Sequence, residues 1–173
     1  ITLAQLRGLA VGIIGFQLIA SGIADQGIGR TVLAWFGLMI WLGLMTKEFF
    51  IHEWLKTQLL IYAVSHMLIM PLIGWWLLQF GVPQVTPALS SGAWIMLALF
   101  LSGFEGEIVR KTWGPDEEMD GVDSYSKIFG ARGSICVAMA LHALLTGTLV
   151  ALLGKITGAW INTYTLLMTV AGG

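Results

Sequence analysis

Acidic side chains are concentrated in one short segment of this chain. Only 11% of the residues are charged, yet seven of the ten acidic residues lie between Glu105 and Asp123. The basic residues Arg110, Lys111 and Lys127 lie within this segment or just after it. Carboxylate oxygens bind the hard cation Mg²⁺, and arginine and lysine neutralise phosphate oxygens. The combination predicts a site for a magnesium-bridged phosphate group.

The spacing inside the segment separates two groups of side chains. If the preceding apolar helix continues, Glu107, Arg110 and Lys111 share one helix face, because they are three and four positions apart. The Gly-Pro pair at 114–115 then ends that helix, and further acids follow on a turn from Asp116 onward. We expect Glu107, Arg110 and Lys111 to bind the phosphate. The alternative interpretation is a solvated loop that carries surface charge.

The remainder of the chain is apolar enough to belong in a membrane. The 173 residues are 57% hydrophobic, with a mean hydropathy of +0.82, which excludes an ordinary soluble domain. A spanning helix needs about 20 mostly apolar residues. We therefore predict an all-α, polytopic membrane helix bundle that forms a single domain over residues 1–173. About six transmembrane helices are expected, at residues 2–24, 31–46, 58–80, 88–103, 130–154 and 159–173.

The basic residues predict how these helices are oriented. Lysine and arginine favour the cytoplasmic side of short loops, and six crossings would place seven of the nine basic residues on one side. These seven are Arg7, Lys47, Lys56, Arg110, Lys111, Lys127 and Arg132, whereas Arg30 and Lys155 fall on the other side. We expect an inner-membrane protein with its acidic segment in the cytoplasm. Membrane lipid is the expected surrounding, and no nucleic-acid partner is expected.

Two histidines and three glycines inside the predicted spans have predicted roles in ligand binding, hydrogen bonding or helix packing. His66 precedes Pro71, which should kink the helix, and we predict that His66 lines a ligand cavity; an interhelical hydrogen bond is the alternative. For His142 we expect only such a hydrogen bond. The spacing of Gly8, Gly12 and Gly15 is typical of close helix packing in lipid.

The acidic segment resembles a known motif. It contains EIVRK at 107–111, PDEE at 115–118, GVDSYS at 121–126 and FG at 129–130, and this order is similar to the second acidic motif of the UbiA superfamily of intramembrane prenyltransferases. The loop KEFF at 47–50 and the helix from Leu59 to Pro71 resemble a less-characterised branch of the same superfamily.

The resemblance implies both a fold and a chemistry. It implies a helical bundle with a cavity open to lipid, in which Mg²⁺ holds an isoprenyl diphosphate whose tail lies among the helices. Loss of diphosphate would give an allylic cation that an electron-rich acceptor captures. Asp116 and Glu117 match the adjacent acids of the motif, and with Asp120 they are the expected magnesium ligands.

The superfamily also has a first acidic motif and about nine helices. This chain has no counterpart of that first motif, so we expect it to be incomplete relative to the family, and its activity as this chain alone is left open. Two other functions stay open as well. One is a non-catalytic membrane subunit that binds lipid, quinone or pigment in a larger assembly with other membrane subunits, and the other is a permease-like protein.

Overall fold

The computed structural model describes residues 2–81 and 89–157, and all regular secondary structure in these residues is helical. The prediction of an all-α fold is therefore confirmed. The helices are α1 (Leu3–Asp25), α2 (Arg30–Thr46), the 3₁₀ turn η1 (Glu48–Phe50), α3 (His52–Lys56), α4 (Leu59–Met67), α5 (Ile69–Gly81), α6 (Leu89–Arg110) and α7 (Tyr125–Thr157).

Four stretches are long and apolar enough to cross a membrane, and they indicate a membrane protein. They are Leu3–Asp25, Leu59–Phe80, Ser91–Arg110 and Tyr125–Ile156. The predicted span at 31–46 forms α2, a shorter apolar helix of 17 residues. The predicted span at 159–173 lies outside the described residues. The fourth predicted span continues to Arg110, so the first part of the acidic segment is helical.

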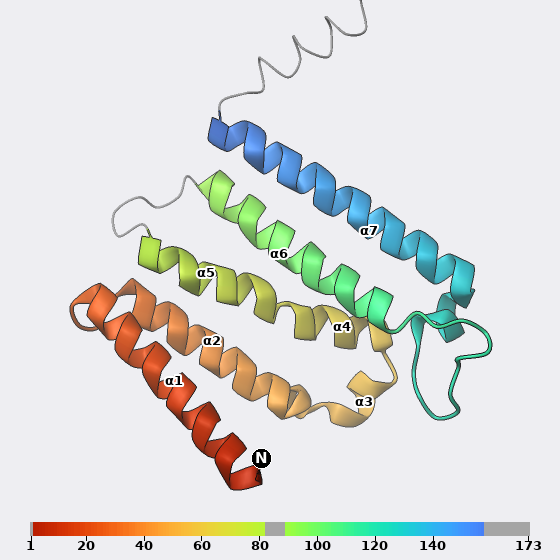
Figure 1. Ribbon diagram of the computed structural model, residues 1–173, viewed down its shortest axis with the longest axis horizontal. Helices are drawn as coiled ribbons and strands as arrows, with labels where there is room; N and C mark the ends of the chain where they lie inside the picture. The colour runs from red at the N-terminus through yellow and green to blue at the C-terminus, as the bar shows by residue number, and fades with distance from the viewer. Residues whose placement is uncertain (1, 82–88, 158–173) are drawn as a thin grey trace, which may run out of the picture.

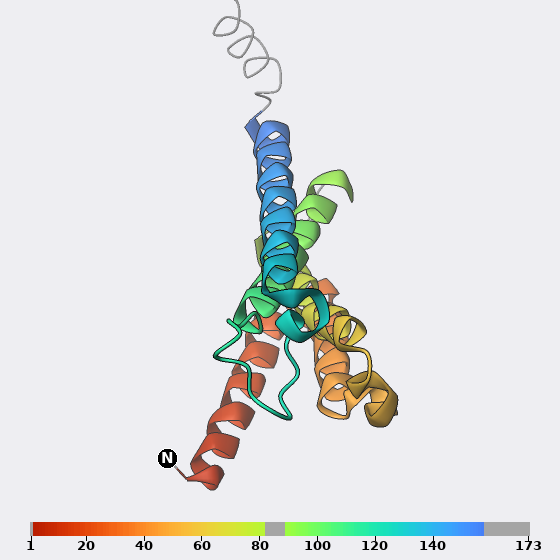
Figure 2. The same ribbon diagram turned by 90° about the vertical axis from the view of Figure 1, so that its right-hand side faces the viewer.

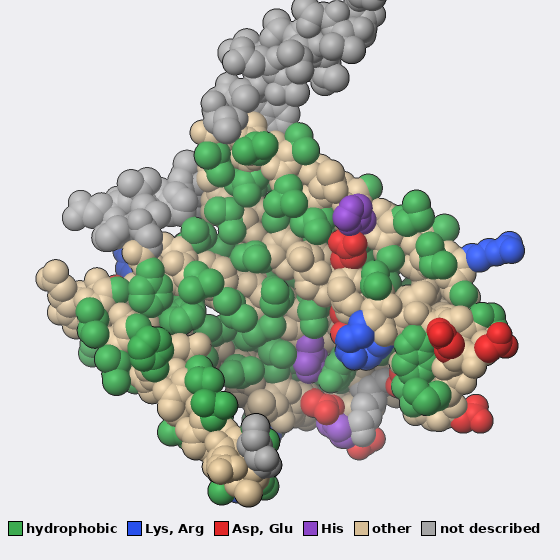
Figure 3. All heavy atoms as spheres, viewed as in Figure 1, with side chains coloured by type: hydrophobic (Ala, Val, Ile, Leu, Met, Phe, Trp, Pro, Cys, Tyr) green, Lys and Arg blue, Asp and Glu red, His purple; other side chains and the backbone are tan. Residues whose placement is uncertain are grey.

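The long helices lie side by side in one row. α1 packs on α2, α2 on α5, α5 on α6, and α6 on α7, as Figure 1 shows from the broad side. Turned by 90°, the part around α7 is narrow, whereas α1 and α2 diverge toward the bottom of the view (Figure 2). Few side chains are therefore buried, and both core clusters are small: one contains Ala63, Leu101, Ile108, Tyr125 and Leu141, and the other contains Trp35, Leu38 and Trp76. A largely hydrophobic surface results (Figure 3).

Short-range signals set the helix ends. α1 stops where Gln26 and Gly27 adopt positive φ angles of 54° and 145°. The Asp25 carboxylate then accepts hydrogen bonds from the backbone N–H groups of Thr31 (3.2 Å) and Val32 (2.9 Å). Those donors belong to the first turn of α2, where carboxylates stabilise a helix. Asp25, the acid beside the first predicted span, is thus a helix cap.

The helix predicted to kink near Pro71 is divided at Leu68 into α4 and α5. Proline has no N–H to donate to the carbonyl of Met67 four residues earlier, which explains the position of the break. The break directs α4 toward the end of the row at which α3 and the α6–α7 loop lie (Figure 1).

Close helix packing occurs at other glycines than those the spacing predicted. A Cβ added at Gly8, Gly12 or Gly15 would meet no atom within 4 Å. At Gly74 it would overlap Leu99 Cδ1, and at Gly103 it would lie 2.8 Å from Met70 Cγ. The close contact is therefore between α5 and α6, and it draws α4 toward the C-terminal end of α6.

Candidate functional site

A buried carboxylate organises the C-terminal end of α6. The Glu107 side chain is only 8% exposed and accepts Arg110 Nη2 at 2.6 Å and Lys111 Nζ at 3.0 Å. The structure thus brings these three side chains together as their spacing predicted. Arg110 is 66% exposed and Lys111 only 20%. Glu107 therefore holds two cations in place, and the two differ in their access to water.

Lys111 lines a polar pocket of about 330 Å³. The other lining residues are Glu48, Leu59, Tyr62, Gly121, Val122 and Asp123. They come from the turn after α2, the start of α4 and the loop between α6 and α7. The Lys111 ammonium lies 5.6 Å from the centre of the Tyr62 ring, a cation–π distance that also restrains the lysine.

The predicted cavity residue His66 lies behind this pocket. Its ring stacks on Tyr62 with centroids 3.9 Å apart, and its Nδ1 donates to the Tyr62 carbonyl oxygen at 2.9 Å. The rings of Phe49 and His66 are edge-on to each other, at 6.1 Å between centroids. His66 is not among the described residues that line the pocket. Its hydrogen bond is within α4, not between helices, and its packing fixes the position of Tyr62.

A strained turn brings Glu48 to the pocket. Glu48, Phe49 and Phe50 have φ angles of 46°, 54° and 60°, a left-handed conformation that is costly for residues with a Cβ. His52 Nδ1 contacts the Glu48 carboxylate, and Phe49 packs edge-on against Trp41. Strain of this kind is common at functional sites. Sequence reasoning assigned Glu48 no role, because no spacing rule describes three left-handed residues in a row.

The loop between α6 and α7 is ordered by its own hydrogen bonds. Ser124 Oγ lies 2.9 and 2.8 Å from the two oxygens of Glu118 and accepts the backbone N–H of Lys127 at 3.2 Å, so it caps α7. Lys127 Nζ donates to the carbonyls of Met119 (2.6 Å) and Val122 (2.7 Å). The hydroxyl groups of Ser126 and Ser124, together with the Lys127 ammonium, lower the pKa of Glu118.

These bonds hold both ends of the loop and present Asp123 to the pocket. The Tyr125 backbone N–H donates to the Lys111 carbonyl oxygen at 2.9 Å, and the Trp113 N–H donates to Ser126 Oγ at 2.9 Å. Tyr125 is fully buried, and its hydroxyl has no hydrogen-bond partner among the described residues. Glu118 is therefore engaged inside the loop, whereas the Asp123 carboxylate lines the pocket.

The predicted magnesium ligands lie elsewhere on this loop. Asp116, Glu117 and Asp120 are exposed, and Glu117 accepts the Gly114 N–H at 3.1 Å. No group of three or more acidic, histidine or cysteine side chains in residues 2–81 and 89–157 could hold a metal ion. Magnesium binding by these three residues stays a prediction. The acids that line the pocket are Glu48 and Asp123.

A scan against protein-family models, a search of curated proteins and a search of solved structures found no match to the chain. The function is therefore argued from the pocket and from the residues that line it.

Proposed function

We propose that the pocket around Lys111 binds the diphosphate group of an isoprenyl diphosphate, and that the chain is a UbiA-like membrane protein of the prenyltransferase type. One observation carries this proposal. Lys111, oriented by the buried Glu107, lines the same polar pocket as two carboxylates from separate loops, at one end of a row of apolar helices.

The charges of the pocket require a cation to accompany the diphosphate. Glu48 and Asp123 contribute two negative charges and Lys111 contributes one positive charge, so a free diphosphate would be repelled. Mg²⁺ commonly binds through one or two carboxylates together with substrate phosphate oxygens. Glu48 and Asp123 suit that role, and Lys111 would neutralise the phosphate charge that remains.

The rest of the site suits the proposed substrate and its chemistry. An apolar tail would enter the membrane beside α4 and α6, where Leu59 lines the pocket. Cleavage of the allylic C–O bond leaves both bonding electrons on the diphosphate and a cation on the isoprenyl group. Lys111 is positioned to stabilise the charge that develops on the leaving group, and Mg²⁺ would supply Lewis-acid stabilisation of the same charge.

Binding of farnesyl diphosphate, measured by titration calorimetry in detergent with and without Mg²⁺, tests the proposal. We expect magnesium-dependent binding that weakens at least about tenfold in Lys111→Ala, because a charge-assisted bond contributes roughly 1.5–3 kcal/mol. Arg132→Ala is the matched control, since it removes one exposed positive charge from α7. An unmodified protein that shows no magnesium-dependent binding would refute the proposal.

A second set of variants separates the two possible ligand pairs. If Glu48 and Asp123 hold the metal, Glu48→Gln and Asp123→Asn should weaken magnesium-dependent binding more than Asp116→Asn and Asp120→Asn do. The reverse order would assign the metal to the exposed part of the loop, as the motif resemblance implied.

We also propose an inner-membrane location with this pocket on the cytoplasmic side, as the distribution of basic residues predicts. A cysteine introduced at Asp120, in a Cys136→Ser background, tests the orientation. A membrane-impermeant maleimide added to intact cells should leave it unlabelled and should label it after lysis. Labelling of intact cells would refute this orientation.

A further inference from the structure

An ionisable pair links α6 and α7 inside the apolar part of the row. His142 Nδ1 lies 2.9 Å from Glu105 Oε1. The His142 side chain is 68% exposed, and that of Glu105 is 20% exposed. On the broad face in Figure 3, a histidine lies next to an acidic side chain within a hydrophobic surface above α6 and α7. Neither residue lines the pocket around Lys111.

The position of this pair calls for a further partner. Glu105 belongs to the membrane-length stretch Ser91–Arg110 and precedes Arg110 by five residues, or about 8 Å along the helix axis. A span whose charged end, Arg110, is at the membrane surface therefore places Glu105 inside a hydrocarbon layer about 30 Å thick. Ionisable groups at that depth are costly unless they are paired. In the described part of the chain, Glu105 Oε2 and His142 Nε2 have no hydrogen bond. Within residues 2–81 and 89–157, one acceptor and one ring nitrogen are therefore available on the exposed side of the pair.

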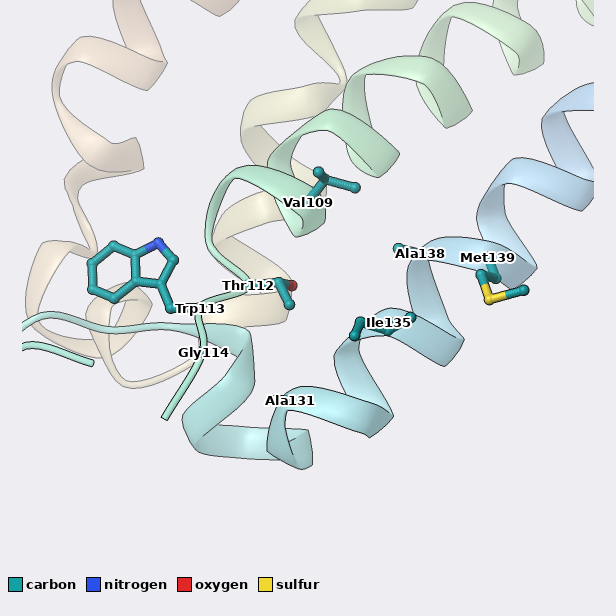
Figure 4. Close-up of a pocket in the computed structure, with 8 residues that line it drawn as sticks. All are labelled: Val109, Thr112, Trp113, Gly114, Ala131, Ile135, Ala138 and Met139. Carbon is teal, nitrogen blue, oxygen red and sulfur yellow. The ribbon is translucent and has the colours of Figure 1, made fainter. Parts of the chain in front are cut away.

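An apolar groove leads to this pair. It has a volume of about 380 Å³ and lies between the end of α6 and the first half of α7 (Figure 4). Its lining residues are Val109, Thr112, Trp113, Gly114, Ala131, Ile135, Ala138 and Met139. Val109 is one helical turn after Glu105, and Met139 is one turn before His142, so the pair continues the groove deeper into the membrane.

We propose that this groove and the Glu105–His142 pair bind a membrane amphiphile that carries a hydroxyl group, such as a long-chain alcohol or a phenol. The apolar body would lie along the groove between α6 and α7. The hydroxyl would donate to Glu105 Oε2 and accept from the Nε2–H of His142.

Hydroxyl chemistry fits better than the alternatives. A hydroxyl is both a donor and an acceptor, so one group satisfies both free positions without bringing net charge into the hydrocarbon. A carboxylate could accept from His142 Nε2–H, but it has no proton to donate to Glu105 Oε2 and would bring a net negative charge into the hydrocarbon. A plain hydrocarbon would leave both positions unsatisfied. The proposal is independent of diphosphate binding, because no residue of this groove lines the pocket around Lys111.

Photo-cross-linking in lipid nanodiscs tests the proposal, with a diazirine-bearing hexadecanol as the probe and the matching fatty acid and alkane as comparisons. We expect the alcohol to label groove residues such as Ile135 and Met139 at least about tenfold more than either comparison. The double variant Glu105→Leu/His142→Phe should lose this preference. It should still fold, because replacing both partners of a pair by apolar groups is often neutral or stabilising.

The control is Gln79→Leu, which removes a polar group from α5 and should leave labelling unchanged. Retention of the alcohol preference in the double variant, with its folding verified by its melting temperature, overturns the proposal. The proposal is also overturned if the unmodified protein shows no alcohol preference. In that case, a dimer that the double variant converts to a monomer would show that the pair binds a helix of a second copy. Magnesium-dependent diphosphate binding should be unchanged in the double variant, so this site and the pocket around Lys111 can fail separately.

Discussion

The two ion pairs of Glu107 should differ in strength in the opposite order to their lengths. The shorter pair, with Arg110 at 2.6 Å, is the more exposed, whereas the pair with Lys111 is 3.0 Å long and largely buried. Double-mutant cycles with Glu107→Gln, Arg110→Met and Lys111→Met measure the coupling free energy of each pair.

Burial decides the expected magnitudes. At 3.0 Å and an effective dielectric constant of 20, the attraction between Glu107 and Lys111 is roughly 5–6 kcal/mol before desolvation. At 2.6 Å in water the attraction to Arg110 is only about 1.6 kcal/mol. Exposed pairs typically contribute about 0.2–1 kcal/mol, and loss of one partner of a buried pair costs about 3–5 kcal/mol. We therefore expect a coupling free energy of about 2 kcal/mol for Lys111 and less than about 1 kcal/mol for Arg110.

Unfolding in mixed detergent micelles, followed by circular dichroism at neutral pH and moderate salt, would provide the free energies. Added salt should weaken the coupling to Arg110 more than the coupling to Lys111, because exposed pairs are screened more strongly. A coupling to Arg110 that equals or exceeds the coupling to Lys111 would refute the reasoning, since it would mean that burial does not govern these pairs.

Three further predictions concern the parts that support the site. The pKa of Glu118 is lowered from 4.5, so its ionised form stabilises the loop above pH 4.5, and this stabilisation is lost as the pH falls through the lowered pKa. In that pH range, hydrogen exchange of the loop, corrected for its intrinsic rate, should accelerate in the unmodified protein but not in Glu118→Gln. Ser21→Ala leaves the buried Trp76 Nε1, now bonded to Ser21 Oγ at 3.0 Å, without an acceptor, and should destabilise the protein by about 1 kcal/mol in detergent unfolding. Gly130→Ala places a Cβ at φ 70° and ψ 158° and should cost about 1–3 kcal/mol, whereas Gly147→Ala, with open space around it, should not destabilise.

The helices could be predicted because the length of an apolar run and the spacing of side chains along a helix can both be read directly from the sequence. Hydrophobic length identified the helices that run through the apolar row, and the three-and-four spacing placed Glu107, Arg110 and Lys111 on one face. The span predicted at 31–46 forms the apolar helix α2, whose 17 residues make it shorter than the four membrane-length stretches, so its crossing of the membrane stays a prediction. The close contacts at Gly74 and Gly103 also escaped prediction, because they depend on which residues of a neighbouring helix each glycine meets.

Tertiary contacts decide which acidic side chains share a partner or a pocket. Acids that are close together in the sequence are not always close together in the structure. Glu105 and Glu118 fall within the same acidic segment of the sequence. Glu105 nevertheless pairs with His142, 37 residues later, while Glu118 binds within its own loop. The carboxylate that joins Asp123 at the pocket is Glu48, which lies outside the segment and reaches the pocket through a turn with three left-handed residues.

A dense run of acids therefore overstates the number of carboxylates available to one ligand. Caps, ion pairs and loop hydrogen bonds use several of them to build the fold, because a buried or partly buried carboxylate must be satisfied before the chain can pack around it. In this chain Asp25, Glu107 and Glu118 have such structural partners. Glu48 also has a partner, because its carboxylate contacts His52, but like Asp123 it lines an open pocket. Ligand binding then falls to these two carboxylates, and this is why the variants Glu48→Gln and Asp123→Asn are more informative than changes in the densest part of the acidic segment.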